Sequence, residues 1–168
     1  MAKLSKKIYW DTCIFLAWFY NEPNEASVVD GIEEMVRDVD NNRAKLITSV
    51  VTRTEILESK LNADAKVKYD KLFKRKNVVM VNLDPRISDL SHEIRDYYAQ
   101  KGEILSTPDC QHIATAILHE VDALYTLDGS GKKKRGKILP LSGNVAEKYK
   151  LQILKPQASA TNLLTGLK

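Results

Sequence analysis

Cysteine is scarce in this 168-residue sequence, which contains only Cys13 and Cys110. Two thiols are too few for the disulfide framework that stabilises many small secreted proteins. The N-terminal residues also lack the apolar core and the small-residue cleavage site of a secretory signal peptide. We therefore expect a cytoplasmic protein whose cysteines are free thiols.

Long hydrophobic runs are missing as well. The longest apolar stretch, Cys13–Phe19, is far shorter than the roughly 20 residues that a membrane-spanning helix needs. The sequence therefore predicts no transmembrane segment and no membrane partner.

Glycine and proline are few, at 7 and 5 residues, and 43% of the residues are hydrophobic. This composition is sufficient for one packed core, and the chain contains no recognisable internal repeat. We expect residues 1–156 to form a single globular domain. The segment after Pro156 has no convincing apolar pattern, so residues 157–168 are predicted to be a flexible C-terminal tail.

Neither sign of charge dominates. Charged residues make up 29% of the sequence, and the formal net charge is +4. This modest basic excess suits a polyanionic partner such as a nucleic acid without requiring one.

Short apolar runs alternate with amphipathic segments along the chain, which indicates alternating strands and helices. The predicted strands are Lys6–Asp11, Lys45–Thr48, Asn77–Leu83 and Ala123–Thr126, with Lys137–Leu141 as a fifth. The predicted helices are Cys13–Tyr20, Glu25–Asp40, one capped near Ser49, Asn62–Lys76, one beginning at Asp84-Pro85, one beginning at Thr107-Pro108, and a short one near Val145–Tyr149. This alternation favours an α/β fold with a mainly parallel central sheet flanked by helices.

Acidic side chains stand where the predicted elements meet. Asp11 and Asp128 lie at or just past the ends of predicted strands, and Asp109 opens a predicted helix. Ligand sites of parallel α/β sheets lie at the carboxyl ends of the strands, so we expect these side chains in one crevice. Gathered carboxylates repel one another unless a cation compensates them. Because Mg²⁺ and Mn²⁺ take oxygen ligands, such a cluster can build a metal site for phosphodiester hydrolysis.

Four short motifs resemble those of the PIN-domain nucleases and, among them, the VapC-type toxins of toxin–antitoxin pairs. The motifs read YWDT at Tyr9–Thr12, TRTEILES around Glu55, DCQHIATA at Asp109–Ala116 and DALYTLD at Asp122–Asp128. Their order and spacing over about Lys6 to Asp128 make the match fairly specific. The sequence departs from compact members after Asp128, where a basic loop follows.

The resemblance implies a PIN-like three-layer fold and a ribonuclease that uses Mg²⁺ or Mn²⁺ to hydrolyse RNA, leaving a 5′-phosphate. It implies that the metal-binding and catalytic acids are Asp11, Glu55, Asp109 and Asp128. The hydroxyls of Thr12 and Thr126 match positions that support the metal site. The resemblance also implies a homodimer and a small protein antitoxin as partner.

Several residues have a simpler interpretation beside the functional one. Glu58 lies one turn from Glu55, and Asp122 is the substitute for Asp128 if that residue is only a turn acid. The Thr12 hydroxyl is predicted to cap the helix that follows it. The three histidines are predicted to be structural, and the two cysteines to be small buried helix residues.

The basic run after Asp128 also has two interpretations. Such a run is commonly a solvated loop, but beside a metal ligand it is well placed to contact RNA phosphates around the scissile bond. The residues predicted to bind RNA on the second interpretation are Lys132, Lys133, Lys134 and Arg135.

Other nuclease and enzyme classes fit less well. A PD-(D/E)xK nuclease needs its Pro-Asp element first, whereas Pro108-Asp109 follows Glu58-Ser59-Lys60 here. Arg86 and His92 fit the loose spacing of HEPN ribonucleases, but those are all helical. The first strand lacks the Gly-rich fingerprint of a Rossmann enzyme. Two alternatives to a toxin remain open: an RNA-processing PIN nuclease and a catalytically inactive PIN-like RNA-binding module.

Overall fold

The structure is a computed structural model that describes residues 5–20, 26–129 and 137–159. The predicted RNA-binding residues Lys132, Lys133, Lys134 and Arg135 lie outside these ranges, as do residues 160–168 of the predicted tail.

A sheet of five strands in the order β3-β2-β1-β4-β5 forms the centre of the fold. The strands are β1 (Lys6–Trp10), β2 (Ala44–Ser49), β3 (Val78–Val81), β4 (Ala123–Tyr125) and β5 (Ile153–Leu154). Every adjacent pair in this sheet is parallel, and Ile8 of β1 lies opposite Leu46 on one side and Ala123 on the other. The predicted α/β fold with a mainly parallel sheet is confirmed.

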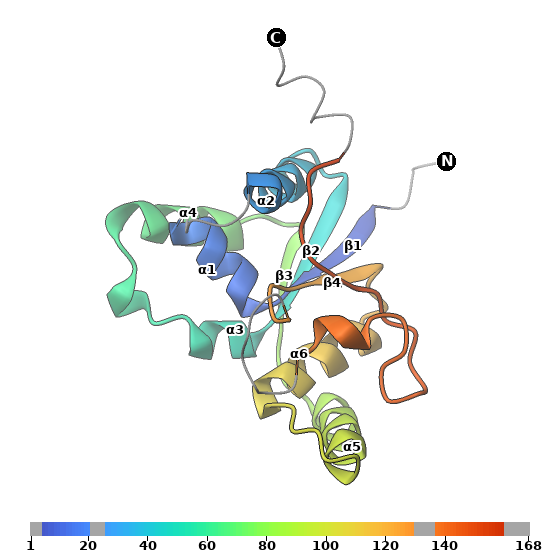
Figure 1. The fold of residues 1–168 in the computed structure, drawn as a ribbon. Helices are drawn as coiled ribbons and strands as arrows, with labels where there is room; N and C mark the ends of the chain where they lie inside the picture. Colours follow the sequence, from blue (N-terminus) through green and yellow to red (C-terminus); the bar gives the residue numbers. More distant parts are fainter. Residues whose placement is uncertain (1–4, 21–25, 130–136, 160–168) are drawn as a thin grey trace.

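Helices cover both faces of this sheet (Figure 1). They are α1 (Thr12–Tyr20), α2 (Ala26–Asp40) and α4 (Ala63–Phe73) on one face, and α5 (Pro85–Gln100) and α6 (Thr107–Leu118) on the other. β1 contributes to both layers because side chains alternate along a strand: Ile8 and Trp10 lie in the first core and Tyr9 in the second. The predicted three-layer arrangement is thus present. Within the described ranges, no helix has both the length and the apolar character needed to cross a membrane.

Side-chain caps fix where these helices begin. Asp84 Oδ1 accepts the N–H of Ile87 at 3.0 Å at the start of α5, as predicted. The cap of α6 is Ser106 rather than Thr107. The prediction that the Thr12 hydroxyl caps α1 is wrong, because Thr12 is already the first helical residue and its hydroxyl donates to the carboxylate of Glu55 instead.

The fifth strand is not the one predicted. Lys137–Leu141 contains Pro140, which has no N–H to donate to a neighbouring strand, and Leu139–Leu141 forms a 3-10 turn. The edge position next to β4 is taken by Ile153 and Leu154, whose partners are Leu124 and Tyr125.

The predicted short helix at Val145–Tyr149 is a tight turn. Ala146 and Glu147 have φ angles of 50° and 54°, in the left-handed region, and Val145 pairs with Tyr149 in an antiparallel bridge. The N–H of Ala146 donates to the Tyr98 hydroxyl at 2.9 Å, which holds the turn against α5.

The C-terminal segment stays in contact with the domain beyond the predicted boundary at Pro156. The N–H of Ala158 donates to the Ser27 carbonyl at 2.9 Å. Gly31 of α2 faces the backbone of Gln157, where a Cβ on Gly31 would lie 2.5 Å from the Gln157 nitrogen. Residues 157–159 are therefore docked on α2, in contrast to the predicted loose tail.

Candidate active site

Asp11 lies at the carboxyl end of β1, where the strand passes directly into α1. Its backbone N–H donates to the Tyr125 carbonyl at 3.0 Å, which extends the β1–β4 pairing by one residue. Asp11 is only 6% exposed, and its Oδ1 accepts the N–H of Thr12 at 2.6 Å. The end of a strand buried on both faces therefore fixes the position of this carboxylate.

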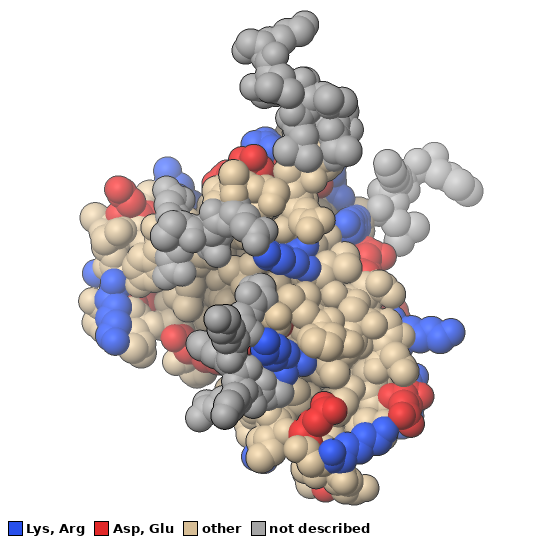
Figure 2. Space-filling model, in the orientation of Figure 1, with Lys and Arg blue, Asp and Glu red and all other residues tan. Residues whose placement is uncertain are grey.

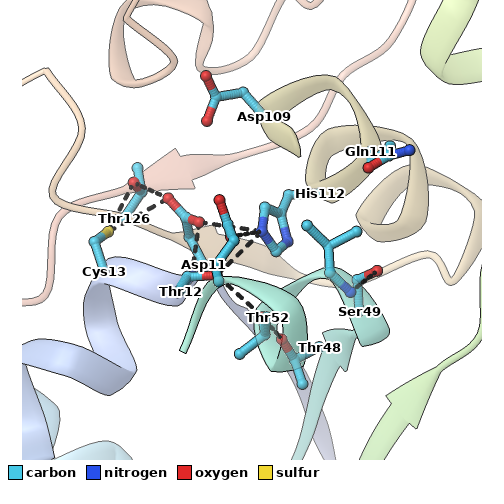
Figure 3. Close-up of polar contacts among 12 residues, drawn as sticks. Asp11, Thr12, Cys13, Thr48, Ser49, Thr52, Asp109, Gln111, His112 and Thr126 are labelled. Carbon is cyan, nitrogen blue, oxygen red and sulfur yellow. Dashed lines mark hydrogen bonds and ion pairs between the residues drawn. The ribbon is translucent and has the colours of Figure 1, made fainter. Parts of the chain in front are cut away.

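Thr126 connects the end of β4 to Asp11 (Figure 3). Its hydroxyl donates to Asp11 Oδ2 at 2.7 Å and accepts the N–H of Asp128 at 3.0 Å. Thr126 is fully buried, whereas Asp128 is partly exposed. One hydroxyl thus links the two acids that follow neighbouring strands.

Glu55 reaches the same edge of the sheet as the last residue of the short helix α3 (Val50–Glu55). Ser49, at the end of β2, caps this helix by accepting the N–H of Val51. Glu55 Oε2 accepts a hydrogen bond from the Thr12 hydroxyl at 2.5 Å. Because α3 follows β2 directly and ends at Glu55, it places the Glu55 carboxylate next to Thr12 at the start of α1.

Asp109 lies in the first turn of α6, and Figure 3 shows it above Asp11 and His112, with no dashed contact drawn to either. Ser106 accepts the N–H of Asp109 at 3.2 Å and donates to its Oδ2 at 2.5 Å. Burial raises the pKa of Asp109, and the negative charges of Asp11 and Asp128 raise it further, against the lowering effect of Ser106. Asp109 and Asp128 are thus near enough to Asp11 for their charges to interact. Neither belongs to the group whose ligand atoms lie within 4.8 Å of one another, which consists of Asp11, Glu55 and His112.

His112, one of the three histidines predicted to be structural, lies in this cluster. Its ring is 1% exposed, and its Nε2 lies 3.1 Å from Glu55 Oε2 and 3.5 Å from Asp11 Oδ1. It follows Asp109 by three residues on α6, and side chains at that spacing share a helix face. That spacing is the signal that would have connected His112 to the acids.

The surroundings of His112 and Glu55 favour their charged forms. Burial acts to lower the pKa of His112, but the hydrogen bond to Glu55 and the nearby carboxylates outweigh it and raise that pKa. Burial also opposes ionisation of Glu55, yet hydrogen bonds from His112 and Thr12 lower its pKa. Each of the two side chains therefore contributes to the pKa shift of the other.

The cluster offers a donor set that fits a divalent cation. One ligand atom each from Asp11, Glu55 and His112 lies within 4.8 Å of the other two. Burial is the largest cause of the raised pKa of Asp109, and the charges of Asp11 and Asp128 contribute to it, so these acids add negative charge at this edge. A divalent cation would compensate it, and carboxylate oxygens are ligands that Mg²⁺ and Mn²⁺ accept.

The substitute acids considered from the sequence lie elsewhere. Asp122 precedes β4, at the opposite end of that strand from Asp128, and its carboxylate accepts the N–H of Lys7 at 2.7 Å. Glu58 is exposed in the 3-10 turn that follows α3. Neither Asp122 nor Glu58 therefore replaces the acid for which it was the substitute.

Both cysteines are free thiols, as predicted. Cys110 is buried in the second core. Cys13 Sγ lies 3.3 Å from Asp11 Oδ2 and 3.4 Å from Thr126 Oγ1. Burial raises the pKa of Cys13, and the charge of Asp11 adds to the shift. Cys13 is therefore a protonated hydrogen-bond partner at the edge of the site.

Residues 8–137 match the PIN domain family. The match spans most of the chain, including all four predicted acids, and the chain belongs to the PIN domain family. A comparison with curated proteins gave no match.

Solved structures share this fold at low sequence identity. A chain of VapBC2 from Rickettsia felis, bound to a DNA fragment from its promoter, matches with a TM-score of 0.57 at 18% identity, over 71% of this chain and 86% of that chain. A toxin–antitoxin complex from Klebsiella pneumoniae gives 0.54 at 17% identity, over 90% and 99% of the two chains. FitAcB from Neisseria gonorrhoeae gives 0.53 at 15% identity, over 89% and 97%. At these identities the likeness establishes the fold alone.

Proposed function

We propose that this PIN-domain chain is a metal-dependent endoribonuclease and the toxin of a toxin–antitoxin pair. The observation that carries the proposal is the cluster at the carboxyl edge of the sheet, where ligand atoms of Asp11, Glu55 and His112 lie within 4.8 Å of one another. Keeping like charges together costs stability. A fold that accepts this cost at one edge is well suited to hold a cation there.

In this proposal Asp11, Glu55, Asp109 and Asp128 hold Mg²⁺ or Mn²⁺. When bound, the ion polarises the scissile phosphate and makes a water molecule acidic enough to attack it. The protein's own part is to fix the carboxylates. The Thr126 hydroxyl orients Asp11 at 2.7 Å, the Thr12 hydroxyl orients Glu55, and Ser106 orients Asp109.

RNA is the proposed substrate because the chain belongs to the PIN domain family and carries a basic run that begins four residues after Asp128. Lys132, Lys133, Lys134 and Arg135 would contact phosphates that flank the scissile bond. This role is a proposal from the sequence, since those residues lie outside the described ranges.

An antitoxin partner is proposed because the structures that share the fold include VapBC2 from Rickettsia felis and a toxin–antitoxin complex from Klebsiella pneumoniae. We propose that a small protein covers or blocks the acidic site, that the chain forms a homodimer, and that it acts in the cytoplasm, where its RNA substrate is found.

Cleavage of RNA by the purified protein tests the enzymatic part. We expect the wild type to cut single-stranded RNA in Mn²⁺ or Mg²⁺ and to stop when a chelator is added, and we expect Asp11→Asn and Asp109→Asn to reduce the rate at least 100-fold. Equal cleavage by the wild type and both variants would indicate a contaminating nuclease and would overturn the assignment.

Expression in a bacterial host tests the toxin part. Induction of the wild type should arrest growth, and induction of Asp11→Asn should not. Co-expression of the protein encoded next to this gene should restore growth. RNA cleavage in vitro without growth arrest would favour an RNA-processing nuclease instead.

A further inference from the structure

Glu55 is the least enclosed of the clustered side chains. It is the last residue of the six-residue helix α3, and its side chain is 34% exposed, against 9% for Asp11. A long side chain at the end of a short helix has many rotamers to lose when it binds a ligand. Its orientation must therefore come from neighbouring residues.

Two donors meet on a single oxygen of Glu55. The Thr12 hydroxyl donates to Oε2, and His112 Nε2 lies 3.1 Å from the same atom. Nε2 also lies 3.5 Å from Asp11 Oδ1, between the two carboxylates. This arrangement ties Oε2 to the protein and turns the carboxylate of Glu55 toward Asp11.

Tyr9 contacts the side of the His112 ring that faces away from the acids. Its Nδ1 lies 2.7 Å from the Tyr9 hydroxyl, and the two rings pack edge to face at 5.8 Å with an interplanar angle of 71°. Tyr9 is fully buried in β1, and His112 is 1% exposed. The imidazole therefore has one orientation, in which Nδ1 faces Tyr9 and Nε2 faces the acids.

We propose that His112 is a positioning residue, which the buried Tyr9 hydroxyl orients so that its Nε2–H holds Glu55 in the conformation that binds the divalent cation. The inference rests on the proposed metal site and adds a residue to it. Hydrogen-bond partners of metal-binding side chains typically change metal affinity about 10- to 100-fold when they are removed. Although its Nε2 lies within ligand distance of the same site, His112 should act on affinity through Glu55, because that nitrogen carries the hydrogen that faces Glu55 Oε2.

Two isosteric variants separate this role from a purely structural one. The amide of His112→Gln can place an N–H near the position of Nε2, so it can still donate to Glu55. The shorter amide of His112→Asn can still accept from Tyr9 near the position of Nδ1 but does not reach Glu55. Tyr9→Phe removes the hydroxyl that orients the ring and leaves His112 in place.

Mn²⁺ binding should be measured by calorimetry for the wild type and the three variants, together with the melting temperature of each metal-free protein. We expect His112→Asn to weaken Mn²⁺ binding at least 10-fold, His112→Gln to stay within about 3-fold of the wild type, and Tyr9→Phe to lie between them. The melting temperatures establish that each variant is folded at the temperature of the binding measurement.

Equal Mn²⁺ affinity in the wild type and His112→Asn would overturn the inference while leaving the metal site intact. Equal losses in His112→Gln and His112→Asn would also overturn it, because a rescuing donor should restore the position of Glu55.

Pulsed electron paramagnetic resonance of the Mn²⁺ complex adds a direct readout. We expect no coupling to an imidazole nitrogen, and such a coupling would make His112 a ligand instead. A wild type that binds no Mn²⁺ would reject the proposed metal site as well.

Discussion

At the scale of single residues, each of three carboxylates of the site is held by a hydroxyl. Thr126 binds Asp11, Thr12 binds Glu55 and Ser106 binds Asp109. A hydroxyl can donate to a carboxylate without adding charge, so these contacts orient the acids and leave the negative potential of the site in place. A cation that enters is then attracted by that potential and meets prearranged oxygens.

Binding of a divalent cation should raise the melting temperature of the protein. Mn²⁺ at about 100 times its Kd should stabilise the wild type by about 2.7 kcal/mol, or roughly 5–10 °C in melting temperature for a chain of this size. Asp11→Asn removes a buried charge at constant size, so we expect it to abolish most of the rise. The matched control is Asp122→Asn, at the other end of β4, which should keep the full rise. A rise of equal size in Asp11→Asn would contradict the assignment of Asp11 as a ligand.

The pKa of Asp109 should respond in opposite directions to two substitutions. Asp11→Asn should lower it, because one of the negative charges that raise it is removed. Ser106→Ala should raise it, because the hydrogen bond that stabilises the carboxylate is removed. NMR titration of the Asp109 carboxyl carbon in the presence of a chelator measures both shifts. Shifts of the same sign would show that the charges and contacts around Asp109 are assigned wrongly.

From the sequence, an acid could be placed at the carboxyl edge of the sheet where an element boundary marks it, and its role as a metal ligand stays a prediction. Asp11 and Asp109 stand at a strand end and a helix start, so their common location follows from the rule for parallel sheets. His112 stands within a helix and has no such marker. Its relation to Glu55 depends on the way α6 packs beside α3, which is a tertiary contact that one sequence does not display.

At the scale of elements, the strands and helices that precede β4 were predictable because their apolar residues repeat with a clear period. The chain after β4 lacks such a period. Its order depends on local contacts instead, such as the Pro140 turn and the positive φ angles of Ala146 and Glu147. The edge strand β5 is only two residues long, and so short a strand leaves little pattern in a sequence.

The contact between α2 and the C-terminal segment gives an element-scale prediction. Alanine normally stabilises a helix over glycine by about 1 kcal/mol. On α2, a Cβ at Gly31 would lie 2.5 Å from the Gln157 nitrogen, so we expect Gly31→Ala to reduce the free energy of unfolding by roughly 1–3 kcal/mol. Urea unfolding measures the change.

The matched background is a chain that ends at Pro156. That chain lacks the Gln157 backbone that a Cβ at Gly31 would meet. We therefore expect Gly31→Ala to be neutral or stabilising in it. A destabilisation of the same size in both backgrounds would show that residues 157–159 do not pack on α2.

At the scale of the whole molecule, the formal net charge is only +4. On the face shown in Figure 2, basic and acidic side chains are interspersed. Recognition of RNA would then depend on local contacts near the acids more than on the overall field of the protein.

The basic run after Asp128 provides the corresponding prediction. Replacing Lys132, Lys133, Lys134 and Arg135 by alanine should weaken RNA binding and reduce the salt dependence of the association constant. The log–log slope should fall by about 0.7 for each RNA phosphate that the variant no longer neutralises. The control replaces Lys66, Lys68, Lys71 and Lys74 of the α4 region, where we expect little change. If the salt dependence is unchanged when the four residues of the basic run are replaced, the run is a solvated loop that does not contact RNA.

The central claim is that acids from separate elements form one divalent-metal site at the carboxyl edge of a PIN-domain sheet. Anomalous X-ray diffraction from crystals soaked in Mn²⁺ tests it most directly. We predict a strong anomalous peak in contact with the carboxylates of Asp11 and Asp109, and its disappearance in crystals of Asp11→Asn. A wild-type crystal at saturating Mn²⁺ with no peak at these carboxylates would contradict the claim.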